Sequence, residues 1–178
     1  MIKPANLYYV MLGEMNEDNF EPDIMEVYGN HLIRSSIKST EGEQNKSYWI
    51  EYDWVDNVNK VKFELKSRNI RSNAFLTSML GNNKIVNALK DKEYQYVYLF
   101  GFLDGLFAWD LNDENLRKCE VKVGSIGIGG NSYSYSYSPF NRTKEQLYIP
   151  IEDMVKISDK GIVLPPPPKK EYKFLGNL

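Results

Sequence analysis

The sequence is poor in the side chains from which many enzyme active sites are built. It contains one cysteine, Cys119, and one histidine, His31, among 178 residues. A single cysteine cannot form an internal disulfide or a thiolate zinc site, so Cys119 is expected to be a small apolar residue of the interior. His31 falls on helical spacing and is expected to be structural. Catalytic triads and zinc or histidine-based metal sites are therefore excluded as the main chemistry.

The chain also lacks long apolar runs and a strong charge of either sign. No N-terminal run is typical of a signal peptide, and no run approaches the roughly 20 apolar residues of a membrane span. The net charge is −2, from 22 basic and 24 acidic residues. Such a balance argues against a strongly cationic nucleic-acid coat but allows a local basic groove. We therefore expect an intracellular, cytoplasmic or nucleoid protein without a membrane role.

The composition is that of a folded domain. With 178 residues, 42% of them hydrophobic, the chain can bury a core. We expect one α/β domain (α+β, a mixed sheet flanked by helices) over 1–164 and a proline-rich arm over 165–178. The elements predicted from hydrophobic periodicity are a strand over 7–12, a helix over 21–38, strands over 48–54 and 61–67, a broken helix over 72–91, and strands over 94–103, 106–111, 117–123 and 147–150.

The stretch 48–67 carries the clearest pattern. It predicts two strands joined by a tight turn at 56–59, because apolar and polar residues alternate on both sides of the turn. The apolar positions are Ile50, Tyr52 and Trp54, then Val61, Phe63 and Leu65. These two apolar rows must share a face, so even positions of the first strand align with odd positions of the second. Every such register brings Asp53 to the face of Glu64 and Lys66.

Two interpretations of this cluster remain open. Two carboxylates beside a lysine can form a site for Mg²⁺ or Mn²⁺ with a neighbouring cation, as phosphodiester hydrolysis requires. The same residues can also form the solvated face of an ordinary hairpin, with opposite charges paired across the strands.

The order of these residues resembles the PD-(D/E)XK nuclease superfamily, which includes restriction endonucleases and archaeal junction resolvases. The resemblance consists of Asp53 followed eleven positions later by Glu64-Leu65-Lys66 in the second strand of a hairpin. It covers roughly residues 20–111 and implies a core of helix, three-stranded meander, helix and strand. The chain departs from the superfamily pattern where Tyr52, rather than proline, precedes Asp53.

The resemblance also implies roles for particular residues. Asp53 and Glu64 would be metal ligands together with the Leu65 carbonyl, and Lys66 would lie beside the nucleophilic water. A further acidic residue is expected from the preceding helix, where Glu26 is the match.

The function implied is that of a Mg²⁺-dependent endonuclease acting on double-stranded DNA, with a homodimer as a further expectation. Four polar residues follow the hairpin and are expected to contact nucleic acid, namely Arg68, Arg71, Asn73 and Lys84. One alternative is an inactive nuclease-like module that binds nucleic acid or protein. Another is a small interaction protein that uses the tyrosines of 133–137 and the proline arm.

Overall fold

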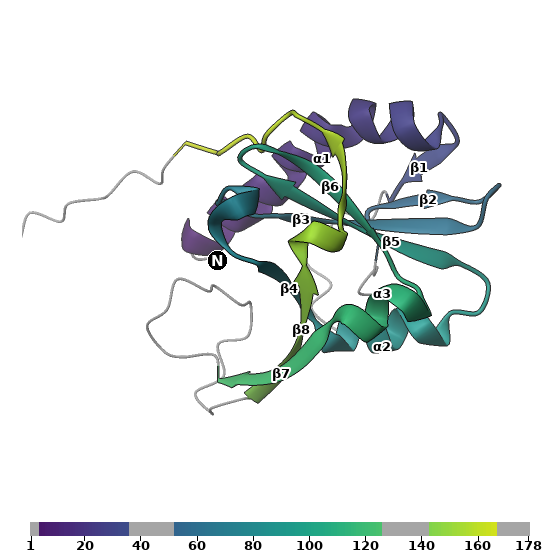
Figure 1. Ribbon diagram of the computed structural model, residues 1–178. Coiled ribbons are helices and arrows are strands. Elements are labelled where there is room, and N and C mark those ends of the chain that lie inside the picture. The colour runs from purple at the N-terminus through teal and green to yellow at the C-terminus, as the bar shows by residue number, and fades with distance from the viewer. Residues whose placement is uncertain (1–3, 36–51, 126–142, 167–178) are drawn as a thin grey trace, which may run out of the picture.

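The computed structural model describes residues 4–35, 52–125 and 143–166 and shows an α+β fold with a mixed sheet, as predicted (Figure 1). The main sheet has the order β1 (Leu32–Arg34), β2 (Trp54–Asp56), β3 (Val61–Ser67), β5 (Gln95–Phe102), β6 (Gly105–Asp110) and β9 (Val155–Ser158). Strands β3 and β5 are parallel, and the other neighbours are antiparallel. A second, antiparallel sheet has the order β4 (Thr77–Gly81), β8 (Thr143–Pro150) and β7 (Glu120–Ser125).

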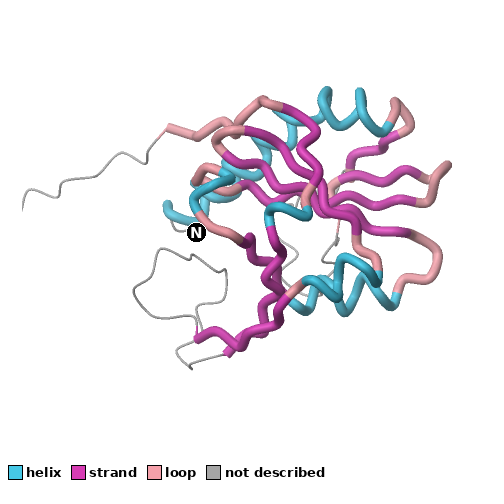
Figure 2. Tube along the Cα trace, in the orientation of Figure 1, coloured by secondary structure: helices cyan, strands magenta, loops and turns pink. Residues whose placement is uncertain are grey.

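Three α-helices complete the described part of the chain, namely α1 (Pro4–Tyr28), α2 (Asn82–Lys90) and α3 (Asp113–Lys118), with short 3₁₀ turns at Ser72–Ala74 and Ile151–Asp153. In Figure 2, α1 lies on one side of the main sheet, and α2 and α3 lie on the other. None of these helices is both long and apolar enough to cross a membrane.

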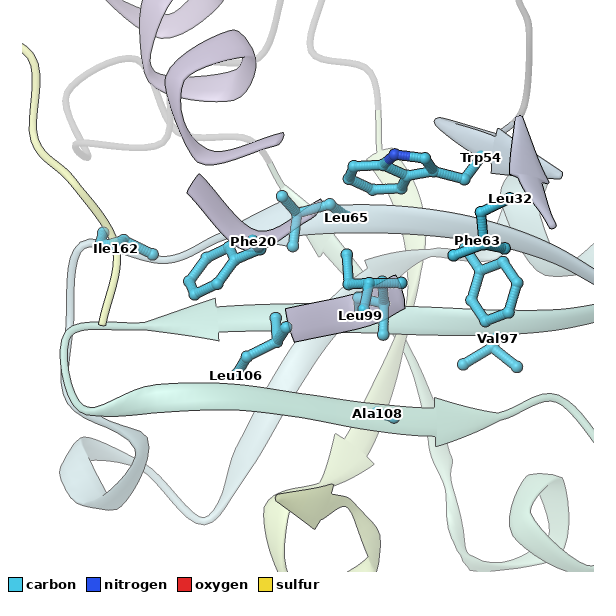
Figure 3. Close-up of a cluster of buried hydrophobic side chains, with 11 residues drawn as sticks. Phe20, Leu32, Trp54, Phe63, Leu65, Val97, Leu99, Leu106, Ala108 and Ile162 are labelled. Atoms are coloured by element: carbon cyan, nitrogen blue, oxygen red, sulfur yellow. The ribbon is translucent and has the colours of Figure 1, made fainter. Parts of the chain in front are cut away.

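Helix α1 covers its face of the sheet with a row of buried residues spaced four apart, namely Leu12, Asn16, Phe20 and Ile24. Positions i and i+4 lie on the same side of a helix, so this row forms one stripe. Phe20 and Ile24 belong to a core that includes Trp54, Phe63 and Leu99 (Figure 3). Trp54, Phe63 and Leu65 of the predicted apolar row therefore lie on the surface on which α1 packs. Tyr52 does not, because its ring lies 5.0 Å from Lys62 Nζ, and Ile50 lies outside the described residues.

Strand β5 is buried on both faces. Val97 and Leu99 point into the core beneath α1, while Tyr98 and Phe100 belong to a second core. That second core also contains residues of β4, α2 and β8, namely Leu80, Ile85, Ala88, Leu147 and Ile149. The prediction of a central strand over 94–103 is confirmed, and its continuous apolar run results from this double burial.

The hairpin has the register predicted from its alternation. Trp54 is opposite Phe63, and Asp56 is opposite Val61. The Asp56 side chain accepts hydrogen bonds from the backbone N–H groups of Val58 (2.8 Å) and Asn59 (2.9 Å), which closes the turn. Residues 36–51, which include most of the predicted first strand, lie outside the described residues.

Two predictions near the N-terminus are wrong. The apolar run 7–12 lies in α1 and is not a strand. The helix predicted over 21–38 ends at Tyr28, and Gly29 follows with a φ of 97°, a left-handed conformation that suits glycine after a helix. His31 is therefore exposed in the turn before β1 and is not helical. The apolar run 7–12 was too short to distinguish a strand from part of a long helix.

The helix predicted over 72–91 is also wrong in its first half. Residues Thr77–Gly81 form strand β4, which pairs with β8, and only Asn82–Lys90 is α-helical. Ser78 and Leu80 are buried while Met79 between them is exposed, which is the period of a strand with one packed face. Pairing with a distant strand thus overrides the local helical pattern. The tyrosines of 133–137 and the arm from 167 onward lie outside the described ranges.

The segment after β9 is attached to α1 by a fully buried amide. Asn16 Nδ2 donates to the carbonyls of Leu12 (2.7 Å) and Val163 (2.9 Å), and Asn16 Oδ1 accepts from the Val163 N–H (2.7 Å). These bonds join residues 147 positions apart in the sequence. The amide nitrogen and the amide oxygen of this buried side chain are thus both satisfied by backbone groups.

Candidate functional site

Glu64 is a buried carboxylate in the middle of strand β3. Only 4% of the residue is exposed. Its neighbours Phe63 and Leu65 point into the core beneath α1, so Glu64 points to the opposite face, where it is paired in register with Tyr98 of β5. A carboxylate in such a place requires compensation by hydrogen bonds or opposite charge.

Two lysines supply this compensation, but both contact the same one of the two carboxylate oxygens. Lys66 Nζ donates to Glu64 Oε1, and Lys84 Nζ lies 3.1 Å from the same oxygen. The other oxygen, Oε2, is buried and accepts no hydrogen bond from any described residue. A buried acceptor without a partner costs about 1–3 kcal/mol, so a cation or hydrogen-bond donor at Oε2 would be stabilising.

Asp53 directly precedes β2, and it contacts the same segment of β3. Its N–H donates to the Phe63 carbonyl (2.7 Å), just before the regular pairing of β2 with β3 begins at Trp54. Its side-chain Oδ2 then accepts from the Leu65 N–H (2.6 Å). The Asp53 carboxylate therefore lies beside the residue that separates Glu64 from Lys66.

The electrostatics of Asp53 also connect it to the other charges of the site. Burial raises the pKa of the Asp53 carboxyl to about 6. The hydrogen bond from Leu65 and the charge of Lys66 lower this pKa, whereas the negative charges of Glu17 and Glu64 raise it. Asp53 is thus close enough to both Glu64 and Lys66 to interact with their charges.

The acidic residue that α1 brings toward the site is Glu17. Glu26, the predicted residue, is exposed, and no described contact joins it to Asp53 or Glu64. Glu17 lies nine residues earlier on α1, which is about 2.5 turns, and it forms an ion pair with Arg34 of β1 at 2.7 Å. The sequence prediction missed Glu17 because it placed this residue outside any helix. The spacing of four between the buried residues of α1 is the signal that would have found it.

The four residues predicted to contact nucleic acid occupy different places. Lys84, in the first turn of α2, is the one that contacts Glu64. Arg68 directly follows β3, and its guanidinium donates to the Met79 carbonyl. Burial lowers the pKa of Arg68. Arg71 and Asn73 are exposed around the first 3₁₀ turn, away from the described contacts of Glu64.

The donors present fit a divalent cation that prefers oxygen. In the described ranges no three or more His, Cys, Asp or Glu side chains converge in a group that could hold a metal ion. Asp53 and Glu64 nevertheless offer two carboxylates. The Leu65 carbonyl points to the same edge as its N–H, toward Asp53. Mg²⁺ is commonly held by one or two carboxylates and keeps several waters, so these oxygens are the groups in the described part of the chain that could contribute to such a site.

Comparison of the chain with protein-family models, curated proteins and solved structures found no match. The function is therefore inferred from the geometry of the site.

Proposed function

We propose that this protein is a Mg²⁺-dependent nuclease that hydrolyses phosphodiester bonds in DNA. The observation that carries the proposal is the Glu64 carboxylate, which is buried beside two lysines and has one oxygen without a partner. The order of elements supports it as well. Helix α1, the meander β1–β2–β3, helix α2 and strand β5 follow one another in the order that the resemblance to PD-(D/E)XK nucleases implies, with β4 inserted before α2.

Each residue has a role in this proposal. Asp53, Glu64 and the Leu65 carbonyl would hold the cation. A bound Mg²⁺ polarises a phosphate and lowers the pKa of a coordinated water. Lys66 would orient the attacking water and offset the negative charge that develops on the phosphate. Glu17 remains paired with Arg34 and adds negative potential near Asp53.

Double-stranded DNA is the proposed substrate, and the cofactor is Mg²⁺ or Mn²⁺. Mn²⁺ is expected to replace Mg²⁺ because both cations suit carboxylate, carbonyl and water ligands. Since Mn²⁺ generally binds such sites with measurable affinity, it is the better probe for titration.

The test is cleavage of supercoiled plasmid with Mg²⁺, with Mn²⁺ and with EDTA, together with calorimetric titration of the protein with Mn²⁺. Wild-type protein should cleave only with a divalent cation. Glu64→Gln should lose both cleavage and Mn²⁺ binding. The matched control is Glu114→Gln, because the Glu114 side chain is 84% exposed on α3. Cleavage by Glu64→Gln at the wild-type rate would disprove the assignment. DNA binding by wild-type protein without any cleavage would support the inactive nuclease-like module instead.

A further inference from the structure

Lys84 is a second lysine at a carboxylate that already has one. Lys66 Nζ and Lys84 Nζ both approach Glu64 Oε1. The two ammonium groups repel each other across a short distance, and a single carboxylate cannot neutralise both. Lys66 and Lys84 therefore share one carboxylate oxygen, and Lys84 can leave Glu64 while Lys66 remains paired with it.

The position of Lys84 is also unfavourable for the helix that carries it. Lys84 is the third residue of α2, near the positive end of the helix dipole, where an acidic residue would stabilise the helix. Lys90, in the last turn, has the favourable position. Helix stability alone thus does not account for a lysine at 84.

Packing holds Lys84 in this position. The next residue, Ile85, and Ala88 one turn later are buried in the core shared by α2, β5 and β8. The Lys84 carbonyl accepts a hydrogen bond from the Tyr98 hydroxyl at 3.3 Å, and Tyr98 is the β5 residue opposite Glu64. The backbone at 84 is therefore fixed relative to Glu64, and only the side chain is free to change partner.

We propose that Lys84 binds a phosphate group of the substrate and that Glu64 holds Lys84 until a divalent cation is bound. This inference rests on the proposed function. When Glu64 takes a cation as its partner, the charge that retains Lys84 is neutralised. The Lys84 ammonium then becomes available to the nearest remaining anion, which is a phosphate of the nucleic acid. A lysine is a point charge on a long stem, so it can move between two oxygens in this way.

The proposal predicts opposite effects on two ligands. Lys84→Met keeps the length of the side chain but removes its charge. It should bind Mn²⁺ roughly threefold or more tightly than wild type, because the cation no longer competes with this ammonium. It should bind a DNA duplex more weakly, and the slope of log K against log salt should fall by about 0.9 for the lost phosphate contact. A purely structural lysine would weaken both ligands together.

The experiment uses the full chain in two assays. Calorimetry with Mn²⁺ alone gives the metal affinity, and fluorescence anisotropy of a labelled duplex in Ca²⁺, at several salt concentrations, gives the DNA affinity and the slope. Lys84→Arg should restore duplex binding because it retains the charge. Lys90→Met is the control on the same helix, since Lys90 is exposed in the last turn.

The outcomes separate this inference from the proposed function. If wild-type protein cleaves DNA and Lys84→Met matches it in Mn²⁺ affinity and salt slope, the role of Lys84 is disproved and the nuclease assignment stands. If Lys84→Met binds both Mn²⁺ and DNA more weakly, with a urea midpoint below that of wild type, Lys84 is structural and the inference is overturned. If wild-type protein neither binds Mn²⁺ nor cleaves, both proposals fail.

Discussion

Lys62 and Glu64 lie two residues apart on the same face of β3, and both are mostly buried in ion pairs, but their surroundings differ. Lys62 Nζ is 2.6 Å from Asp91 Oδ2 and 3.5 Å from the Tyr96 hydroxyl. Its ammonium also lies over three aromatic rings, at 5.0 Å from Tyr52, 4.3 Å from Tyr94 and 5.5 Å from Tyr96. Glu64, in contrast, has two ammonium groups at one oxygen and no partner at the other.

The difference is one of charge balance. Lys62 and Asp91 form a one-to-one pair whose remaining surface is covered by aromatic rings, so nothing is left for a ligand to satisfy. The cluster of Glu64, Lys66 and Lys84 has two ammonium groups that share one oxygen and an acceptor without a partner, which are the groups that a phosphate and a metal ion would complete. Under the proposed function these two charged residues of one strand have different roles, so variants in the two clusters should be affected in different assays.

The largest effect is expected for Lys66→Ala. If Lys66 orients the nucleophilic water, its loss should lower the cleavage rate by about 10²–10⁴-fold. The urea midpoint should stay near that of wild type, because Lys84 remains beside Glu64. Plasmid cleavage under single-turnover conditions measures the rate. A variant as active as wild type would show that the activity comes from another site or from a contaminant.

Lys62→Ala should have the reverse profile. Removing Lys62 leaves Asp91 without its ammonium and the tyrosine rings without their cation, which should cost about 2 kcal/mol of unfolding free energy. Urea denaturation measures this loss. Cleavage well below the unfolding transition should stay close to the wild-type rate. A rate loss as large as that of Lys66→Ala, in folded protein, would contradict the distinction between the two clusters.

The pH dependence of stability should have opposite signs for two carboxylates in metal-free protein. The hydrogen bond from Lys62 lowers the pKa of Asp91 from 3.8 to about 2. Its stabilisation is therefore complete above pH 4 and is lost as the pH falls through 2. Burial raises the pKa of Asp53 from 3.8 to about 6. The unfolded chain then ionises first, so Asp53 removes stability as the pH rises from 4 to 6.

Urea unfolding in EDTA at pH 2–8 tests both signs. Asp91→Asn should flatten the acidic part of the wild-type curve, and Asp53→Asn should flatten the part between pH 4 and 6. Equal curves for wild type and Asp53→Asn would show that Asp53 titrates normally in the folded protein.

The smallest effect is expected for Lys60→Ala. Lys60 also pairs with a carboxylate, Glu93, and lies over the Tyr94 ring, but its side chain is 48% exposed. Solvent screens such a pair, so the urea midpoint and the cleavage rate should not change measurably. A loss equal to that of Lys62→Ala would mean that burial does not distinguish the two lysines.

The features that the sequence predicted correctly are those that depend on strands close together in the chain. The alternation of Trp54, Phe63 and Leu65 determined the hairpin register. Asp53, one residue before the paired part of β2, lies beside Leu65. The mixed sheet and the apolar β5 were predicted for the same reason, because a strand pattern can be recognised in a segment of only a few residues.

The features that the sequence did not predict depend on contacts between segments that are distant in the chain. Strand β4 forms because it pairs with β8, about 70 residues away. The local sequence pattern does not predict that pairing. Glu17 was missed because α1 was predicted as a strand followed by a shorter helix. The approach of Lys84 to Glu64 depends on how α2 packs on β5 and β8, which hydrophobic periodicity does not specify.

The buried Asn16 has a consequence for how the chain folds. Its hydrogen bonds to Val163 close a loop of 147 residues, and loop closure of this length is entropically costly before other contacts form. The hydrogen bonds between Asn16 and Val163 should therefore form late in folding, after β3, β5 and β6 have paired. Any species in which α1 has not yet packed would expose the apolar face of the sheet, and exposed apolar surface promotes aggregation.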